Sequence, residues 1–300
     1  MSEPMKELCV VHLVRAQNGI EPFRRFLESY RVNSGAIEHD LLVVFKGFAR
    51  QQDTEEYLGM LTPFCHISFY VPDKGFDITA YFAVVMHYSE HYRYFCFLNS
   101  YSVILDHEWL KKLHKNITRQ DVGLVGASGS WGSRLPLNKY FSLPPLASPK
   151  KRRPLYKKLL LPWLMFPFRV AHNIHHRIYF VSFPNYHIRT NAFMISGKLM
   201  KTLNCQPIKT KRDAYRFESG RKGLTKQVLD MGKEIFVVGK DGSGYEMKEW
   251  SESKTFWKYE QENLLVADNQ TCDYQDGSPE RRRYLTAFAW GDDTAENVKK

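Results

Sequence analysis

The sequence predicts an α/β protein whose mostly parallel sheet is flanked by helices. Strand-like apolar runs alternate with amphipathic segments of helical periodicity along the N-terminal third of the chain, which is the pattern of consecutive βαβ units. Each connecting segment is long enough for the right-handed crossover that joins parallel strands. Hydrophobic residues make up 43% of the chain, which is enough for a sizeable core.

The expected elements follow one another in a regular order. A strand over 8–14 leads into a helix over 19–31, where apolar residues recur at helical spacing. Strands are then expected at 40–46, 65–71 and 94–98, and helices at 54–62, 77–90 and 107–116. Asp77 stands where it can cap the helix that begins there.

The second half of the chain has fewer clear elements. The segment 122–133 begins as a strand and ends in a Gly/Ser loop, which can either approach a ligand closely or be a plain turn. The tetrapeptide 217–220 precedes a helix that Gly232 ends. Further strands are expected at 187–195 and 235–239, and further helices at 196–203 and 224–231.

We expect one domain over 1–291, with an inserted segment or lid at 135–180 and a frayed tail at 292–300. The inserted segment is basic, rich in proline and without periodicity. Within it, a basic cluster precedes the apolar run 159–168, which is too short to cross a bilayer but suits the headgroup region of an anionic membrane. A buried or partner-covered helix flanked by solvated lysines explains the same pattern.

The net charge of +11 favours an anionic partner. No nucleic-acid binding is expected, because the basic residues do not interleave with aromatic residues and no helix-turn-helix or zinc pattern occurs. The five cysteines are odd in number and lack CxxC spacing, as in a reduced cytoplasmic protein. With no secretory leader pattern, we expect a cytoplasmic protein, with peripheral contact at the inner face of the cytoplasmic membrane as a further option.

Polar residues follow the buried strand expected at 94–98. Asn99, Ser100 and Ser102 come directly after it, and ligands of open α/β sheets sit just outside the carboxyl ends of the strands. The sequence therefore predicts a binding site at these residues.

Six short motifs follow one another along the chain: His12-Leu13-Val14-Arg15 and the segments 76–81, 97–102, 126–131, 187–193 and 217–221. In their order and spacing over roughly residues 8–240, they resemble the GT-A type of nucleotide-diphospho-sugar glycosyltransferases. More closely, they resemble the bacterial glycosyltransferase-like proteins of polysaccharide, O-antigen and rhamnan-type assembly. The resemblance implies transfer of a sugar from a nucleotide-sugar donor to a glycan or lipid-diphosphate-linked acceptor in cell-surface polysaccharide synthesis.

The resemblance also implies residue roles on the donor side. The donor-binding residues would be Arg15, Asp77, Asn99, Ser100 and Ser102. Where the family has an Asp-x-Asp motif for a divalent cation, this chain reads Asn-Ser-Tyr-Ser, and amide and hydroxyl groups make a poor site for a hard cation. We therefore expect no cofactor, no metal ligands and a weak or absent dependence on divalent metal.

On the acceptor side, the resemblance makes Glu218 the base that removes the proton of the acceptor hydroxyl. His187, Arg189, Asn191 and Arg221 would contact the acceptor or the diphosphate. Simpler roles are open for several of these residues. Glu218 can be a helix-start glutamate that complements the macrodipole and pairs with a nearby arginine, and His187 and Asn191 can be internal hydrogen-bonding groups.

One further segment is open to two interpretations. Residues 268–271 follow an apolar run and form either a turn or a loop that closes over a nucleotide. An alternative function for the whole chain is a non-catalytic relative that binds a glycan or sugar nucleotide and serves as an assembly scaffold.

Overall fold

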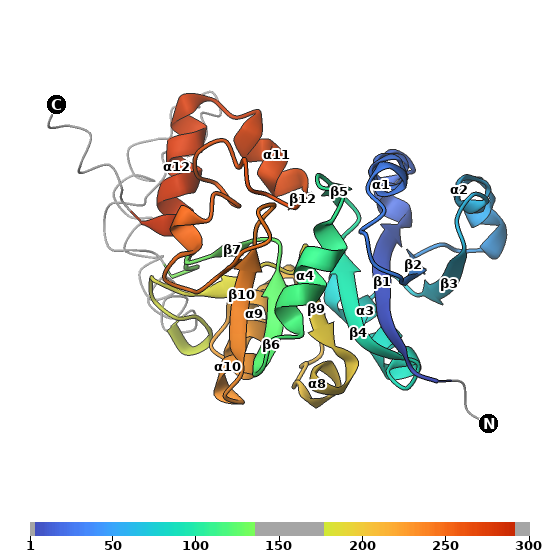
Figure 1. Cartoon of the computed structure of the whole chain (residues 1–300), viewed down its shortest axis with the longest axis horizontal. Coiled ribbons are helices and arrows are strands. Elements are labelled where there is room, and N and C mark those ends of the chain that lie inside the picture. The colour runs from blue at the N-terminus through green and yellow to red at the C-terminus, as the bar shows by residue number, and fades with distance from the viewer. Residues whose placement is uncertain (1–3, 136–176, 292–300) are drawn as a thin grey trace, which may run out of the picture.

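The computed structural model describes residues 4–135 and 177–291, which build an eight-stranded sheet with helices on both faces (Figure 1). The strand order is β11-β10-β6-β9-β4-β1-β2-β3, and all strands except β9 and β11 run in one direction. The predicted mostly parallel α/β fold is therefore confirmed. The strands are β1 (Lys6–Arg15), β2 (Asp40–Lys46), β3 (His66–Val71), β4 (Tyr92–Leu98), β6 (Val122–Gly126), β9 (Ala192–Ser196), β10 (Glu234–Val238) and β11 (Gly244–Tyr245).

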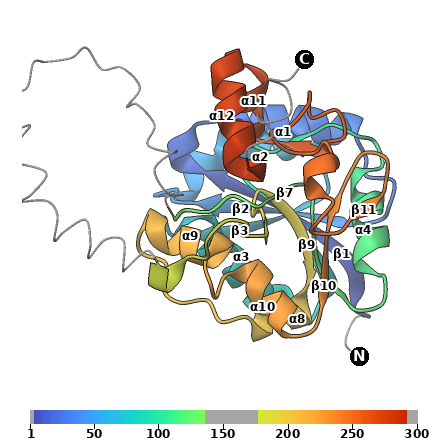
Figure 2. The same cartoon turned by 90° about the vertical axis from the view of Figure 1, so that its left-hand side faces the viewer.

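Helices cover the sheet in two sets, because β1 and β2 alternate buried apolar side chains between the two faces (Figure 2). One core contains side chains of α1, α2 and α4, and the other contains side chains of α3, α8, α9 and α10. The helices are α1 (Glu21–Val32), α2 (Glu55–Leu61), α3 (Phe76–Tyr88), α4 (Trp109–Ile117), α8 (Gly197–Thr202), α9 (Lys211–Ser219), α10 (Leu224–Asp230), α11 (Asn269–Gln275) and α12 (Pro279–Trp290).

Two small ribbons connect the C-terminal segment and the loops to the sheet. β5 (Val103–Ile104) pairs with β12 (Val266–Ala267), and β7 (Gly129–Ser130) pairs with β8 (His187–Ile188). The strand expected at 187–195 is thus divided into β8 and β9. The polar residues between them leave the sheet, and Asn191 O accepts a hydrogen bond from Asn99 N at 2.9 Å.

Three local predictions were wrong. Asp77 is not the cap of α3, because the N-cap is Gly75 at a φ of 67°, where a Cβ would lie 1.9 Å from Thr79 Oγ1. Glu218 does not begin a helix but lies at the C-terminal end of α9. Asp268 is neither in a plain turn nor in a loop, because its side chain caps α11 through hydrogen bonds from the backbone of residues 270 and 271.

The predictions for the inserted segment at 136–176, including its basic cluster and apolar run, and for the tail at 292–300 lie outside the described residues. Over the parts of the chain that are described, none of the helices has the length and apolar character needed to cross a membrane.

Candidate functional site

The sheet has a topological switch point between β1 and β4. Chain order runs from β1 outward through β2 to β3, and then returns to place β4 on the opposite side of β1 (Figure 1). The connections leaving β1 and β4 therefore run in opposite directions along the carboxyl edge of the sheet, which is where ligands of open α/β sheets bind. Arg15 ends β1, Lys46 ends β2 and Asn99 directly follows β4.

A cluster of charges occupies this edge of the sheet. The Arg15 guanidinium binds Asp73 in a bidentate manner, with Nε 3.0 Å from Oδ1 and the second nitrogen 2.9 Å from Oδ2. Lys46 Nζ lies 3.6 Å from Asp73 Oδ1, and the side chain of Lys46 is 1% exposed. The hydrogen bond from Arg15 is the main reason that the pKa of Asp73 is lowered. Burial lowers the pKa of Lys46, while Asp73 and Asp77 oppose that shift.

Asp77, the second residue of α3, faces this cluster with a half-buried carboxyl group. Its pKa is raised, first by burial and then by the nearby carboxylates of Glu218 and Asp73, while Lys46 and Arg15 oppose the shift. Among the described residues no hydrogen bond to its side chain is found. The Asp77 carboxyl is therefore free to accept hydrogen bonds from a ligand.

The loop after β4 is held in place by its own polar groups. Asn99 Oδ1 accepts hydrogen bonds from Tyr101 N at 3.0 Å and Ser102 Oγ at 3.2 Å. Ser102 is fully buried, and its hydroxyl also lies 3.3 Å from Asn191 O. Ser102 thus stabilises the loop, whereas the side-chain nitrogen of Asn99 has no hydrogen-bond partner among the described residues. Ser100 is buried beside it.

A buried ion pair fixes the segment between β8 and β9. The Arg189 guanidinium lies 2.6 Å from Asp268 Oδ2, stacks over the Phe256 ring at 4.2 Å and donates to Ser128 Oγ at 3.2 Å. Arg189 is 4% exposed and Asp268 is 1% exposed. Arg189 therefore has an internal partner for its charge, and its predicted contact with a diphosphate stays a prediction.

The same network orients Asn191. An arginine can only donate hydrogen bonds, so the Ser128 hydroxyl must donate its own proton to Asn191 Oδ1 at 3.1 Å. The side-chain nitrogen of Asn191 then points away from Ser128, and it is buried without a hydrogen-bond partner in the described part of the chain.

Glu218 reaches this edge from the end of α9. Its Oε1 accepts hydrogen bonds from both the backbone N and the Oγ1 of Thr190, each at 3.1 Å. These bonds hold a carboxylate at a helix C-terminus, where the macrodipole disfavours negative charge. No partner of Oε2 is found among the described residues, so this oxygen is available to accept a proton.

His187 lies close to Glu218. Its Nδ1 is 2.8 Å from Asn185 O, which assigns the proton to Nδ1 and leaves Nε2 as an acceptor. Burial lowers the pKa of His187, while the charge of Glu218 opposes the shift. The site thus brings together Arg15, Asp77, Glu218 and His187, which lie far apart in the sequence.

Arg221 lies elsewhere. Its Nε donates to Arg177 O at 3.0 Å, and it lines a pocket of about 840 Å³ beside α9 and α10 together with Arg216 and Lys222. Arg221 is not among the charges that shift the pKa of Asp77 or His187. Its predicted contact with the acceptor or diphosphate stays a prediction.

Sequence reasoning missed three charged residues at this edge: Lys46, Asp73 and Arg134. Lys46 ends an expected strand and Asp73 follows one. The rule that ligands bind just outside the carboxyl ends of strands, here called the strand-end rule, singled out Asn99 and applies to these two residues as well. Nothing in the local sequence around Arg134 indicates that it lies near Glu218.

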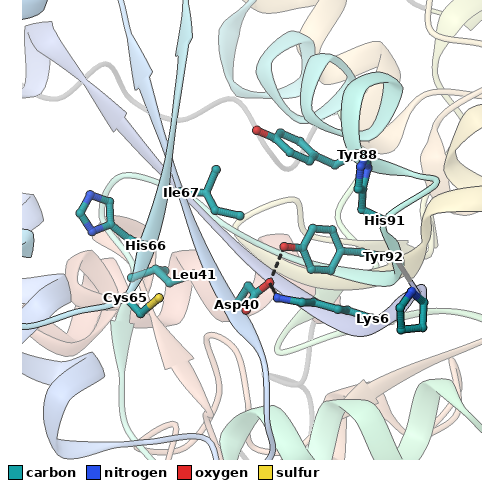
Figure 3. Close-up of a pocket in the computed structure, with 10 residues that line it drawn as sticks. Lys6, Asp40, Leu41, Cys65, His66, Ile67, Tyr88, His91 and Tyr92 are labelled. Atoms are coloured by element: carbon teal, nitrogen blue, oxygen red, sulfur yellow. Dashed lines mark hydrogen bonds and ion pairs between the residues drawn. The ribbon is translucent and has the colours of Figure 1, made fainter. Parts of the chain in front are cut away.

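A second pocket, of about 310 Å³, lies at the opposite, amino-terminal edge of the sheet (Figure 3). There Asp40 Oδ2 accepts hydrogen bonds from Lys6 Nζ at 2.7 Å and from the Tyr92 hydroxyl. Burial raises the pKa of Asp40, but the hydrogen bonds from Lys6 and Tyr92 outweigh burial and lower it. This pocket shares no lining residue with the charged cluster. In the described ranges, no group of three or more His, Cys, Asp or Glu side chains is placed to hold a metal ion.

No protein-family model matches the sequence, and no curated protein matches it. Among solved structures, the chain is similar to the mannosyltransferase PcManGT from Pyrobaculum calidifontis in complex with GDP-Man and Mn²⁺. The two sequences are 10% identical and the TM-score is 0.33. The similarity covers 41% of this chain and 36% of that chain. The chain thus spans about a third of that protein's length.

Two further solved structures cover more of the chain. The 4-diphosphocytidyl-2C-methyl-D-erythritol synthase from Anaerococcus prevotii has 11% identity, 77% of this chain and 87% of that chain covered, and a TM-score of 0.40. The glucosyl-3-phosphoglycerate synthase from Mycobacterium tuberculosis in complex with UDP is 13% identical in sequence, with a TM-score of 0.36. That similarity covers 67% of this chain and 61% of that chain. At such identities and TM-scores the similarity concerns the α/β architecture and not an activity.

Proposed function

We propose that the chain is a glycosyltransferase that moves a sugar from a nucleotide-sugar donor to a hydroxyl group of a glycan or lipid-diphosphate-linked acceptor. One observation carries the proposal: at the switch point of the sheet the side chains of Arg15 and Lys46 meet at Asp73, and the charges of both cations, like that of Glu218, act on the Asp77 carboxyl group. Arg15 and Lys46 supply the positive charge that a nucleoside diphosphate requires.

In the proposed reaction, the acceptor oxygen attacks the anomeric carbon of the donor sugar in a single displacement. Glu218 Oε2 accepts the proton of the attacking hydroxyl, while Oε1 stays hydrogen-bonded to Thr190. The bond between the anomeric carbon and the diphosphate oxygen breaks, and the leaving diphosphate takes the electron pair. Arg15 and Lys46 stabilise the charge that develops on it.

On the donor side, we assign the Asp77 carboxyl and the Asn99 side-chain amide to hydrogen bonds with the sugar or nucleoside. Among the described residues, neither the Asp77 carboxyl group nor the Asn99 side-chain nitrogen has a hydrogen-bond partner that a ligand would have to displace. The hydrogen bonds to Asn99 Oδ1 orient that side chain. The proposal retains a weak or absent dependence on divalent metal, because the position of an Asp-x-Asp motif carries Asn99 and Ser102. It also retains a role in cell-surface polysaccharide synthesis and contact with an anionic membrane.

The first experiment is a thermal-shift screen against UDP, GDP, CMP and dTDP sugars, since a donor at 100 times its Kd stabilises the fold by about 2.7 kcal/mol. Donor hydrolysis and transfer are then measured with and without Mn²⁺ for the donor that binds. The proposal requires turnover that the substitution Glu218→Gln removes while donor binding is retained.

Glu234→Gln is the matched control, because Glu234 is an exposed glutamate at the amino end of β10. Donor binding without any turnover in the unsubstituted protein would instead favour the non-catalytic binding function. A chain that binds none of the sugar nucleotides would contradict both functions.

A further inference from the structure

Glu218 lies between two groups of positive charge. Arg15 and Lys46 act on Asp77, whereas Arg189 and Arg134 act on His187. The charge of Glu218 acts on both Asp77 and His187. Glu218 therefore lies near the donor-side charges through Asp77 and near Arg134 through His187.

Arg134 differs from Arg15 and Arg189 in having no acidic partner among the described residues. Arg15 is paired with Asp73, and Arg189 is paired with Asp268. No carboxylate within the described part of the chain lies within ion-pair distance of Arg134, and its side chain is exposed. An exposed guanidinium without a counter-charge is available to an anionic ligand.

The side chain of Arg134 is nevertheless held in place. Its guanidinium lies 3.1 Å from the centroid of the Tyr215 ring. Tyr215 precedes Glu218 by three residues on α9, so both side chains lie on one face of the helix. Stacking covers one face of the guanidinium and leaves its N–H edges free for a bidentate contact.

The backbone before Arg134 is also anchored. Gly132 N donates to Ser130 Oγ at 2.9 Å, and Ser133 Oγ donates to Val181 O. Ser130 itself pairs with His187 in the β7–β8 ribbon. The position of Arg134 relative to His187 and Glu218 is therefore fixed by hydrogen bonds on one side and by ring stacking on the other.

We propose that Arg134 binds an anionic group, a phosphate or a carboxylate, of the acceptor, on the side of Glu218 that faces away from the donor. This proposal rests on the proposed function, because Glu218 defines where the acceptor hydroxyl lies. Arg134 stacks on Tyr215 of α9, whereas Arg15 and Lys46 end β1 and β2. In this proposal the anion at Arg134 is separate from the donor diphosphate.

The experiment measures anion binding while the donor site is occupied. The protein is saturated with the nucleoside diphosphate identified in the donor screen, and inorganic pyrophosphate or glucuronate is titrated by calorimetry. Unsubstituted protein should bind at least one of the two probes, and Arg134→Gln should weaken that binding by about tenfold or more, since a charge-assisted bidentate contact is lost. Arg134→Lys should retain part of the affinity as a point charge.

Arg119→Gln is the matched control. Arg119 also stacks over an aromatic ring, that of Phe236 at 4.2 Å, but it lies near the amino end of β6. This control should bind the anion as the unsubstituted protein does, and all variants should bind the nucleoside diphosphate equally. Thermal melting curves establish that each variant is folded.

Two outcomes overturn the proposal. Equal anion binding by Arg134→Gln and unsubstituted protein, or no anion binding by either, removes Arg134 from this role. A weakened affinity of Arg134→Gln for the nucleoside diphosphate itself would assign Arg134 to the donor. If the proposed function fails, the protein binds no nucleoside diphosphate at all, which is a different result. The two anions are then titrated into the free protein. Equal anion affinities of the unsubstituted protein and Arg134→Gln in that experiment overturn the Arg134 site as well.

Discussion

Asp40 at the amino-terminal edge of the sheet and Asp77 at the carboxyl-terminal edge have opposite surroundings. At the amino-terminal edge, Asp40 is bound by Lys6 and Tyr92, and the pKa of Asp40 is lowered (Figure 3). At the carboxyl-terminal edge, Asp77 has no hydrogen bond from the described residues, and its pKa is raised. Internal pairing stabilises the first carboxylate, whereas the second is left for an external partner. A buried carboxyl group without an internal partner is typical of a binding site, and this supports the carboxyl-terminal edge as the candidate site.

The largest expected effect at the carboxyl-terminal edge follows from the substitution Glu218→Gln. Loss of the proposed base should lower the transfer rate on the order of 10²–10⁴-fold, with little change in melting temperature, because an amide oxygen still accepts hydrogen bonds from Thr190. Steady-state transfer assays and thermal melting measure the two effects. Transfer at the unsubstituted rate would show that the two edges do not differ in catalytic importance.

Asp268→Ala tests whether buried pairing at the carboxyl-terminal edge is structural. It leaves the Arg189 guanidinium buried without its counter-charge and removes the cap of α11. We expect a loss of about 3–5 kcal/mol in the free energy of unfolding, measured by urea denaturation. A loss below about 1 kcal/mol, the value typical of an exposed pair, would contradict a desolvated Arg189–Asp268 pair.

His12 provides a prediction about pH. This fully buried residue on β1 stacks on Phe26 with ring centroids 3.6 Å apart, and neither ring nitrogen has a hydrogen-bond partner among the described residues. Burial lowers the pKa of His12 to about 3. The unfolded chain therefore takes up the proton first, and the contribution of neutral His12 to stability is lost as the pH falls from about 6.5 toward 3.

Between pH 7 and pH 5, the free energy of unfolding lost through protonation of His12 in the unfolded chain amounts to about 2 kcal/mol. Unfolding curves of the unsubstituted protein and of His12→Leu measure it. The substituted protein should lose about 2 kcal/mol less over this range. Identical pH dependence of the two proteins would place the His12 pKa near its ordinary value.

The smallest expected effect belongs to the amino-terminal edge. Asp40→Asn weakens a partly exposed ion pair with Lys6 and should cost at most about 1 kcal/mol of unfolding free energy. Transfer activity should stay unchanged, because the whole length of β2 separates Asp40 from Lys46. A loss of transfer comparable to that of Glu218→Gln would refute the contrast between the edges.

Local sequence patterns predicted most of the sheet, because each strand is marked by its own apolar run. The strand at 40–46 has the bounds that the sequence predicts. The helix α9 was missed because its buried face is narrow, with Phe217 as its main apolar contribution. The capping box of Thr210 and Asp213 was the signal that could have located its beginning.

The site was predictable only where the strand-end rule applies. That rule led to Asn99, and the family resemblance added Arg15 and Asp77, which the structure places at the same carboxyl-terminal edge of the sheet. Arg134 could not be predicted as a site residue, because its position depends on the pairing of β7 with β8 and on the stacking over Tyr215. These contacts join segments far apart in the sequence, and no local pattern records them.

The reversed direction of β9 has a consequence for how such a site can diversify. Because β9 runs against β4 and β6, the residues that precede it, Arg189 to Asn191, arrive at the same rim as the residues that leave its neighbours. Changes in this short connection can alter the side chains presented at the rim without moving a crossover helix. The inverted strand β9 thus lets part of the rim vary in sequence while the sheet keeps its arrangement.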